Sequence, residues 1–235
     1  MIDEANPLTP KYNIIAQALA HEYGYPTWRQ HYPPVDEMVD CILSQNTNDN
    51  NRDKAFAALK ERFATWEEVR DADPQLVVEA IRPAGLANQK GPRIQGALRH
   101  VTDQVGEISL DHLNDMPVDE AKTWLTSING IGPKTAAIIL LFALNKPALP
   151  VDTHVHRVTK RLGLIGPKTS AEKAHDELEA LVPQDDFYPF HLQIIWHGRQ
   201  VCNARKPKCG ACVLRPHCNY FDSLPPEEQA EKLAT

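Results

Sequence analysis

Apolar residues recur along most of this chain with the period of an α-helix. In the segment 35–43 they stand at positions i, i+3, i+4, i+7 and i+8, which places them on one helical face. No stretch alternates apolar and polar residues convincingly, as a half-buried strand would. The 19 prolines divide the pattern into many short segments. The sequence therefore predicts an all-α protein of about ten helices.

Capping residues mark where several of these helices should begin. Three such starts are a capping box at Thr65 and Glu68, an Asp-Pro pair at 73–74, and a second capping box at Thr169 and Glu172. A last long helix should run from about 189 to 201 and end next to the first of four closely spaced cysteines.

Two predicted helices, at about 118–127 and 133–145, are joined by the sequence Asn-Gly-Ile-Gly. Gly130 and Gly132 permit backbone conformations with positive φ, and Pro133 suits the first position of the second helix. Free amides at that helix start would form a site for an anion such as a DNA phosphate. The pattern is that of a helix-hairpin-helix, although an ordinary tight turn between helices would look the same.

A lysine and an aspartate near this hairpin are candidates for chemistry. Lys134 stands in the first turn of the second helix, where the helix dipole and partial burial would both favour the neutral amine of a nucleophile. The alternative is an ordinary surface lysine. Asp152 stands eighteen residues further on, where capping of the next helix would explain it, although a carboxylate near an amine can also assist its deprotonation. His154 and His156 are two residues apart on a helix and face different sides, so they are not a metal pair.

Four cysteines within 17 residues indicate a metal centre. Cys202, Cys209, Cys212 and Cys218 are separated by six, two and five residues, which suits a [4Fe–4S] cluster better than a zinc ribbon or finger. Zinc and disulfides remain the alternatives. The fifth cysteine, Cys41, lies in an apolar helical stretch and is expected to be a buried thiol.

Composition and charge narrow the possible partners. The 235 residues suffice for one large domain or two small ones. The acidic, polar start does not resemble a signal peptide, and the longest apolar run, at 136–144, is too short to span a membrane. We therefore expect a cytoplasmic protein. The net charge of −6 does not favour nucleic acid, but segment 187–221 has no acidic residue and segment 121–171 has only one. These segments form either a face that grips phosphates or a solvated surface.

Together these motifs resemble the endonuclease III family of DNA glycosylases. The resemblance is carried by Leu-Thr-Ser-Ile-Asn-Gly-Ile-Gly-Pro-Lys-Thr-Ala at 125–136, Val-Asp-Thr-His at 151–154, His-Gly-Arg at 197–199 and the cysteine spacing. It covers about residues 15–220. It implies a two-domain helix-hairpin-helix glycosylase fold. The domains would be a six-helix barrel domain at 28–146, with its hairpin at about 118–145, and an iron–sulfur domain made of 1–27 and 147–235, with its cluster loop at 202–218.

The resemblance also implies an activity and a partner. The activity is removal of oxidised pyrimidines of the thymine glycol type through a Schiff base on Lys134, followed by strand cleavage 3′ to the abasic site by β-elimination. Asp152 would be the catalytic aspartate, and the four cysteines would hold the [4Fe–4S] cluster. The partner would be duplex DNA with a damaged base or an abasic site, bound by a monomer, on the nucleoid of a prokaryote.

The family's DNA-contacting positions can be carried over residue by residue. Leu86 matches the residue that wedges into the base stack, although core packing would also explain a leucine there. The implied DNA contacts are Gly130, Gly132, Gln45, Asn46, Leu86, Arg199, Arg205, Lys206 and Lys208, and the implied base-pocket residues are Asp49 and His154.

The chain departs from the family's pattern at four positions. Asn46 stands where the family usually has Gln, Gln45 where a small residue is common, Pro133 where a basic residue is common, and Asn129 where proline is common. These departures leave open a glycosylase of the same fold that acts on mismatches or photoproducts, and a catalytically weak iron–sulfur DNA-binding relative.

Overall fold

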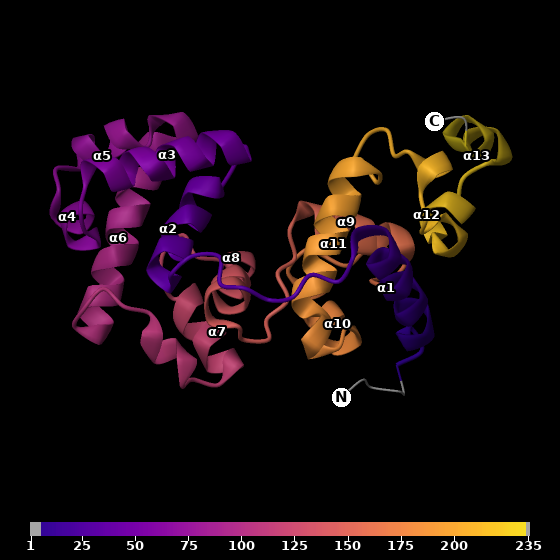
Figure 1. Ribbon diagram of the computed structural model, residues 1–235, viewed down its shortest axis with the longest axis horizontal. Helices are drawn as coiled ribbons and strands as arrows, with labels where there is room; N and C mark the ends of the chain where they lie inside the picture. Colours follow the sequence, from indigo (N-terminus) through magenta and orange to yellow (C-terminus); the bar gives the residue numbers. More distant parts are fainter. Residues whose placement is uncertain (1–5, 234–235) are drawn as a thin grey trace. The chain divides into compact units, whose positions relative to one another are not determined.

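Residues 6–233, the part of the chain that the computed structural model describes, contain helices and no strands (Figure 1). The α-helices are α1 Thr9–Tyr23, α2 Pro34–Ser44, α3 Asp49–Arg62, α4 Trp66–Asp71, α5 Pro74–Ala80, α6 Ala87–Val105, α7 Val118–Thr126, α8 Pro133–Ile138, α9 Thr153–Leu162, α10 Lys173–Leu181, α11 Phe187–Gln200, α12 Asn219–Asp222 and α13 Pro226–Leu233. Short 3₁₀ segments are η1 Arg82–Ala84, η2 Asp111–Asn114, η4 Gln184–Asp186, η5 Cys209–Ala211 and η6 Arg215–His217, and η3 Ile139–Ala143 is a π-helical continuation of α8. The predicted all-α class is confirmed.

The described range holds more helices than the ten expected from the sequence. The additional helices include α12, which is only four residues long. A segment of one or two turns is too short for a hydrophobic period to be read with confidence. Among residues 6–233, no helix combines the length and the apolar composition needed to cross a lipid bilayer.

The chain divides into two units, one of residues 29–146 and one of residues 1–28 with 147–235. The divisions are at 28/29 and 146/147, whereas the expected domain boundaries are 27/28 and 146/147. Within the unit 29–146, α2 is the central helix and packs against α3, α6, α8 and η3 (Figure 1). Eight of its eleven residues are buried, including Cys41, which is 4% exposed. Cys41 is therefore the buried thiol that its apolar surroundings predict.

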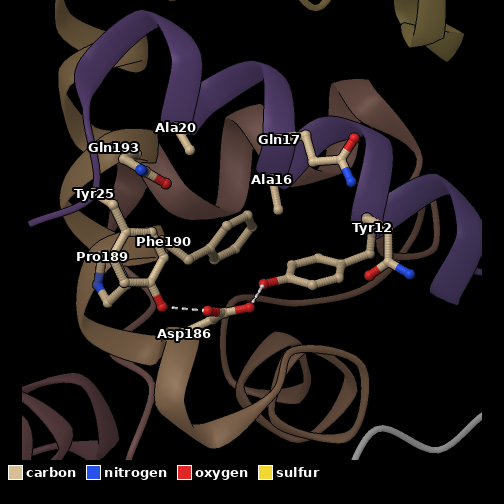
Figure 2. Close-up of a pocket in the computed structure, with 10 residues that line it drawn as sticks. Tyr12, Ala16, Gln17, Ala20, Tyr25, Asp186, Pro189, Phe190 and Gln193 are labelled. Carbon is tan, nitrogen blue, oxygen red and sulfur yellow. Dashed lines mark hydrogen bonds between the residues drawn. The ribbon is translucent and has the colours of Figure 1, made fainter.

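In the other unit, α11 packs against α9 and α1, so the N-terminal helix joins the C-terminal part of the chain. Two tyrosines reinforce this junction. The Tyr12 hydroxyl donates to Oδ2 of Asp186 at 2.8 Å, and the Tyr25 hydroxyl donates to Oδ1 of the same carboxylate at 2.6 Å (Figure 2). Asp186 directly precedes α11, so both tyrosines fix the start of this helix.

Two of the three predicted helix starts are present. The Thr65 hydroxyl accepts from the Glu68 amide, and the Asp73 carboxylate accepts from the Gln75 amide. The third prediction is wrong: α10 begins at Lys173, and the Thr169 hydroxyl donates to the Glu177 carboxylate instead of capping a helix. The Lys173 amide donates to the Ser170 hydroxyl at 3.3 Å, and Glu172, the residue before α10, makes no side-chain cap bond.

Candidate functional site

The hairpin consists of α7, a turn at residues 127–132, and α8. Gly130 has φ +94°, and a Cβ there would lie 3.3 Å from Cδ of Arg93. The positive φ therefore favours glycine at this position, and any other side chain would also have to displace Arg93 slightly. Gly132 differs from the expectation, because its φ of −97° is open to any residue and no atom lies within 4 Å of a Cβ built there. Only one of the two glycines is favoured by the conformation of the turn.

Lys134 is the second residue of α8 and has an exposed side chain. The partial burial that was expected to favour a neutral amine is absent. Its Nζ has no hydrogen bond or ion pair to any of residues 6–233. The amine is therefore accessible to a reactant at the start of a helix, directly after the turn.

A brace that the sequence did not reveal supports this turn. The Gln45 side chain donates from Nε2 to the carbonyl of Gly130 at 3.1 Å, and its Oε1 accepts from Nη1 of Arg93 at 3.1 Å. Gln45, which was expected to contact DNA, thus ties the end of α2 to the hairpin. Arg93 is exposed on α6. No local pattern could have identified it, because residues 45, 93 and 130 are far apart in the sequence.

Two candidate DNA-contacting residues have left-handed backbone conformations. Asn46 has φ +53° and Leu86 has φ +49°. Such a conformation costs about 1–2 kcal/mol for an ordinary side chain, and residues of this kind cluster at functional sites. Leu86 is 48% exposed at the start of α6. Core packing, the alternative explanation for this leucine, is therefore wrong.

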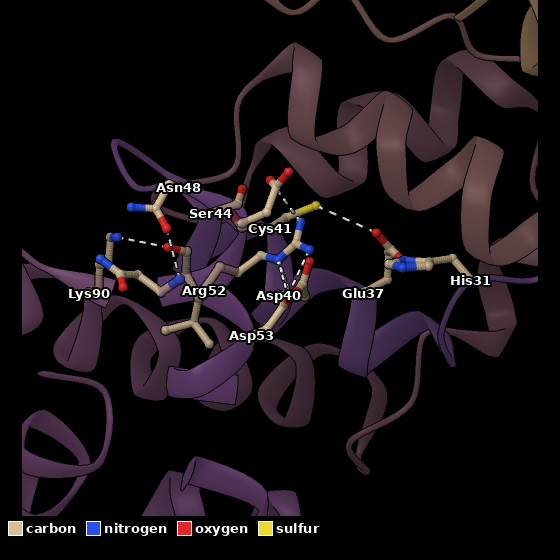
Figure 3. Close-up of polar contacts among 12 residues, drawn as sticks. His31, Glu37, Asp40, Cys41, Ser44, Asn48, Arg52, Asp53 and Lys90 are labelled. Carbon is tan, nitrogen blue, oxygen red and sulfur yellow. Dashed lines mark hydrogen bonds and ion pairs between the residues drawn. The ribbon is translucent and has the colours of Figure 1, made fainter. Parts of the chain in front are cut away.

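Helix α2 also carries two buried acidic residues, Glu37 and Asp40. Asp40 is paired with Arg52 of α3, with 3.3 Å between Oδ1 and Nε (Figure 3). Burial, aided by the nearby carboxylate of Glu37, raises the pKa of Asp40 to about 6, against the lowering effect of Arg52. Asp49, expected in the base pocket, is the first residue of α3 and lies 3.7 Å from Nη1 of Arg52.

Asp152 caps α9, as its position predicts. Its Oδ1 accepts from the amide of Val155 at 2.7 Å. His154 packs closely on α11, where a Cβ at Gly198 would lie 3.0 Å from the histidine Cβ. His156 instead contacts the carbonyl of Thr169 through Nε2. The two histidines have separate surroundings, which agrees with the rejection of a metal pair.

The four C-terminal cysteines line one pocket, together with Arg161, Val201 and Tyr220. None of them forms a disulfide. Burial raises the pKa values of Cys209 and Cys218 and raises that of Cys212 to about 11, and neighbouring thiolates add to each shift. Nη1 of Arg161 lies 3.2 Å from Sγ of Cys202, and Nε2 of His197 lies 3.5 Å from Sγ of Cys212.

The four thiols are the type of donor that a [4Fe–4S] cluster takes. Among residues 6–233, no three His, Cys, Asp or Glu side chains are placed so that they could share one metal ion. In a [4Fe–4S] cluster each thiolate binds a different iron, so the sulfurs need not converge on one point. Bound cations would also reverse the upward shift of the thiol pKa values. The cysteine-lined pocket is therefore chemically suited to a multinuclear centre.

A basic loop lies between the first two cysteines. Arg205, Lys206 and Lys208 are exposed in it. Arg161 holds its backbone by donating to the carbonyls of Asn203 at 2.8 Å and of Ala204 at 2.9 Å. The three cations are thus presented to solvent on a fixed backbone. Arg199 is also exposed, in the last turn of α11.

Comparison with known proteins agrees with this arrangement. Residues 39–184 match the model of the HhH-GPD superfamily of base excision DNA repair proteins. Endonuclease III of Thermotoga maritima is 32% identical over 197 residues, which cover 84% of this chain and 88% of that protein. The chain belongs to the endonuclease III family. It is therefore a helix-hairpin-helix glycosylase of base excision repair.

Solved structures of the family share the fold. A non-covalent endonuclease III–DNA complex has a TM-score of 0.78 and 25% identity, and the match covers 90% of this chain and 95% of that one. A trapped covalent intermediate of endonuclease III with DNA gives the same TM-score and identity, over 90% and 96% of the two chains.

Proposed function

We propose that the protein is a bifunctional DNA glycosylase and abasic-site lyase that removes oxidised pyrimidines from duplex DNA. The observation that carries the proposal is Lys134, an exposed amine without a hydrogen bond or ion pair among the described residues, one residue into the helix after the hairpin turn. Family members that only hydrolyse the base do not need an amine there. The trapped covalent complex of a solved relative supports the same chemistry.

The reaction would proceed through a Schiff base. The neutral amine of Lys134 attacks C1′ of the damaged nucleotide, the C1′–N bond breaks, and its electron pair leaves with the base. Asp152 accepts a proton or stabilises positive charge on the sugar. The C1′–O4′ bond of this adduct then breaks, O4′ takes up a proton, and the nitrogen forms the C=N bond of the Schiff base. The Schiff base makes the C2′ proton acidic, and loss of this proton breaks the C3′–O bond. The strand is thus cut on the 3′ side.

The surface residues would bind and deform the duplex. Leu86 would enter the base stack and Asn46 the gap left by the flipped nucleotide, with Asp49 and His154 facing the flipped base. Their exposure or left-handed backbone supports the assignment for Leu86 and Asn46. Arg199, Arg205, Lys206 and Lys208 would contact phosphates, as would the backbone at Gly130 and Gly132, where first-turn amides of α8 lack helical partners.

The four cysteines would hold a [4Fe–4S] cluster. When bound, the cluster supplies structural support, and no step of base removal is assigned to it. Cys202 and Cys209 stand at the two ends of the basic loop, so ligation would fix the positions of Arg205, Lys206 and Lys208. Iron and acid-labile sulfide analysis of the purified protein tests this assignment, with about four of each per chain expected. One zinc per chain and no iron would contradict it.

An incision assay over a lesion panel tests the proposed reaction. Duplexes carry thymine glycol, an abasic site, a thymine mismatch or undamaged DNA, and products are resolved with and without alkali. We expect strand cleavage without alkali at thymine glycol and at the abasic site. Cleavage at the mismatch alone would assign the protein to another lesion class, and cleavage that appears only after alkali would remove the lyase step.

A further inference from the structure

Lys90 is a buried lysine that the proposed reaction does not use. It lies in the first turn and a half of α6 and is only 1% exposed. Its Nζ donates to the carbonyl of Leu43 at 2.8 Å and to the carbonyl of Ala84 at 2.8 Å. Its own backbone amide donates to the carbonyl of Leu86 at 3.0 Å. Lys90 thus joins its own neighbourhood, residues 84–86, to residue 43, which is distant in the sequence.

These contacts compensate the burial of an ammonium group. Leu43 stands in the last turn of the eleven-residue helix α2, and Ala84 is the last residue of η1. Carbonyls at helix ends lack helical partners and carry the negative end of the dipole. Burial lowers the pKa of Lys90, and no carboxylate pairs with it among residues 6–233. The two carbonyls are therefore the groups that stabilise its charge.

The two carbonyls that Lys90 binds lie two or three residues before Asn46 and Leu86, the candidate DNA-contacting residues with left-handed backbone conformations. Asn46 follows Leu43 by three residues, and Leu86 follows Ala84 by two. Both have positive φ. A strained conformation persists only where the surrounding structure holds it in place. Nζ of Lys90 binds the Leu43 carbonyl ahead of Asn46 and the Ala84 carbonyl ahead of Leu86, so one atom holds both loops.

We propose that Lys90 is a positioning residue: its ammonium group clamps the segments 43–46 and 84–86 together, so that Asn46 and Leu86 are held ready to enter the DNA stack. The proposal rests on the DNA-inserting role proposed above for these two residues. Lys90 itself touches neither DNA nor the reacting atoms. Loss of the clamp should therefore reduce base extrusion more than it reduces DNA binding.

The chain offers a matched control in Gln95. This residue is also on α6 and also 1% exposed, and its Nε2 donates only to backbone carbonyls, at 3.0 Å to Val69 and 2.9 Å to Ala72. Those carbonyls belong to α4 and its C-cap, away from the two loops. Lys90→Met and Gln95→Met therefore remove comparable buried hydrogen bonds from one helix. Both should lower the melting temperature.

Hydrogen exchange tests the clamp without reference to DNA. In Lys90→Met, amides in segments 44–46 and 84–86 should exchange at least about tenfold faster than in wild type, while Gln95→Met should leave them unchanged. Equal acceleration in both variants would overturn the proposal. If Lys90→Met does not fold, hydrogen exchange of the wild-type protein still tests the clamp. A clamp shared by the two segments requires that their amides report one common free energy of opening. Two distinct opening energies would overturn the proposal.

Base destacking tests the consequence. A duplex carries a tetrahydrofuran abasic analogue, which cannot be cleaved, opposite 2-aminopurine, whose fluorescence rises when it unstacks. At saturating protein, Lys90→Met should lose most of the wild-type rise while binding within about threefold of wild type, and Lys90→Arg should recover part of it. A full rise in Lys90→Met would overturn the proposal. A wild-type protein that gives no rise contradicts the proposed function, and the exchange comparison then decides the clamp separately.

Discussion

Replacement of Leu86 by glycine should leave stability almost unchanged while impairing activity on duplex DNA. Leu86 is 48% exposed, so loss of its side chain removes about half of the 1.5–3 kcal/mol of a fully buried leucine, or about 1 kcal/mol. Glycine costs a further 0.5–1 kcal/mol, roughly, in chain entropy. Relief of the left-handed conformation at φ +49° returns about 1–2 kcal/mol. The net change in the free energy of unfolding should lie within about 1 kcal/mol of zero.

The control is Leu98→Ala on the same helix. Leu98 is fully buried, and its truncation should cost about 2–5 kcal/mol. Urea denaturation measures both changes. On DNA, Leu86→Gly should lower kcat/KM for a duplex lesion by about ten- to a hundredfold, the equivalent of roughly 1–3 kcal/mol of lost stacking contact. A loss of stability as large as that of Leu98→Ala, with normal activity, would refute the reasoning and return Leu86 to a packing role.

Three further changes have expected outcomes. Asp152→Asn should keep the cap of α9, because asparagine caps as well as aspartate, and should lower turnover by about 10²–10⁴ with binding intact; unchanged turnover would exclude the carboxylate from the reaction. The pKa of Asp40 is about 6 in the folded protein and 3.8 in the unfolded chain. Between these pH values the folded protein binds more protons than the unfolded chain, so the free energy of unfolding falls as pH rises from about 4 to 6. Asp40→Asn should therefore stabilise the protein at pH 8 by at most about 3 kcal/mol and hardly at all below pH 4, whereas a pH-independent shift in thermal melts would contradict this assignment. Arg205→Ala and Lys208→Ala should each lower the slope of log K against log salt by about 1, and Lys173→Ala, an exposed lysine of α10, should not change it.

The sequence predicted the elements that are determined by residues close together along the chain. Period, capping and turn residues identified the hairpin at 118–145 and the last long helix, and cysteine spacing identified the pocket that all four side chains line. The cap assigned to Thr169 failed because its hydroxyl donates to the Glu177 carboxylate, a contact between residues eight positions apart. Helix α12, with four residues, is too short to show a period.

The contacts that brace the candidate site could not be predicted in this way. Gln45, Arg93 and Gly130 meet only in the folded chain. Lys90 is buried although lysine is rarely buried, and nothing in its neighbours indicates the two carbonyls that it binds. The left-handed conformation of Leu86 is likewise imposed by its surroundings and not by its residue type, whereas asparagine, as at position 46, adopts this conformation more readily.

Borohydride trapping tests the central claim most directly. Wild-type protein and Lys134→Ala are incubated with duplexes that carry thymine glycol or an abasic site, and borohydride reduces any Schiff base to a stable covalent adduct. We expect an adduct of the wild-type protein on both duplexes and none with Lys134→Ala, which should still bind DNA. No adduct with the wild-type protein on either duplex, or an equal yield from Lys134→Ala, would contradict the assignment of Lys134 as the nucleophile.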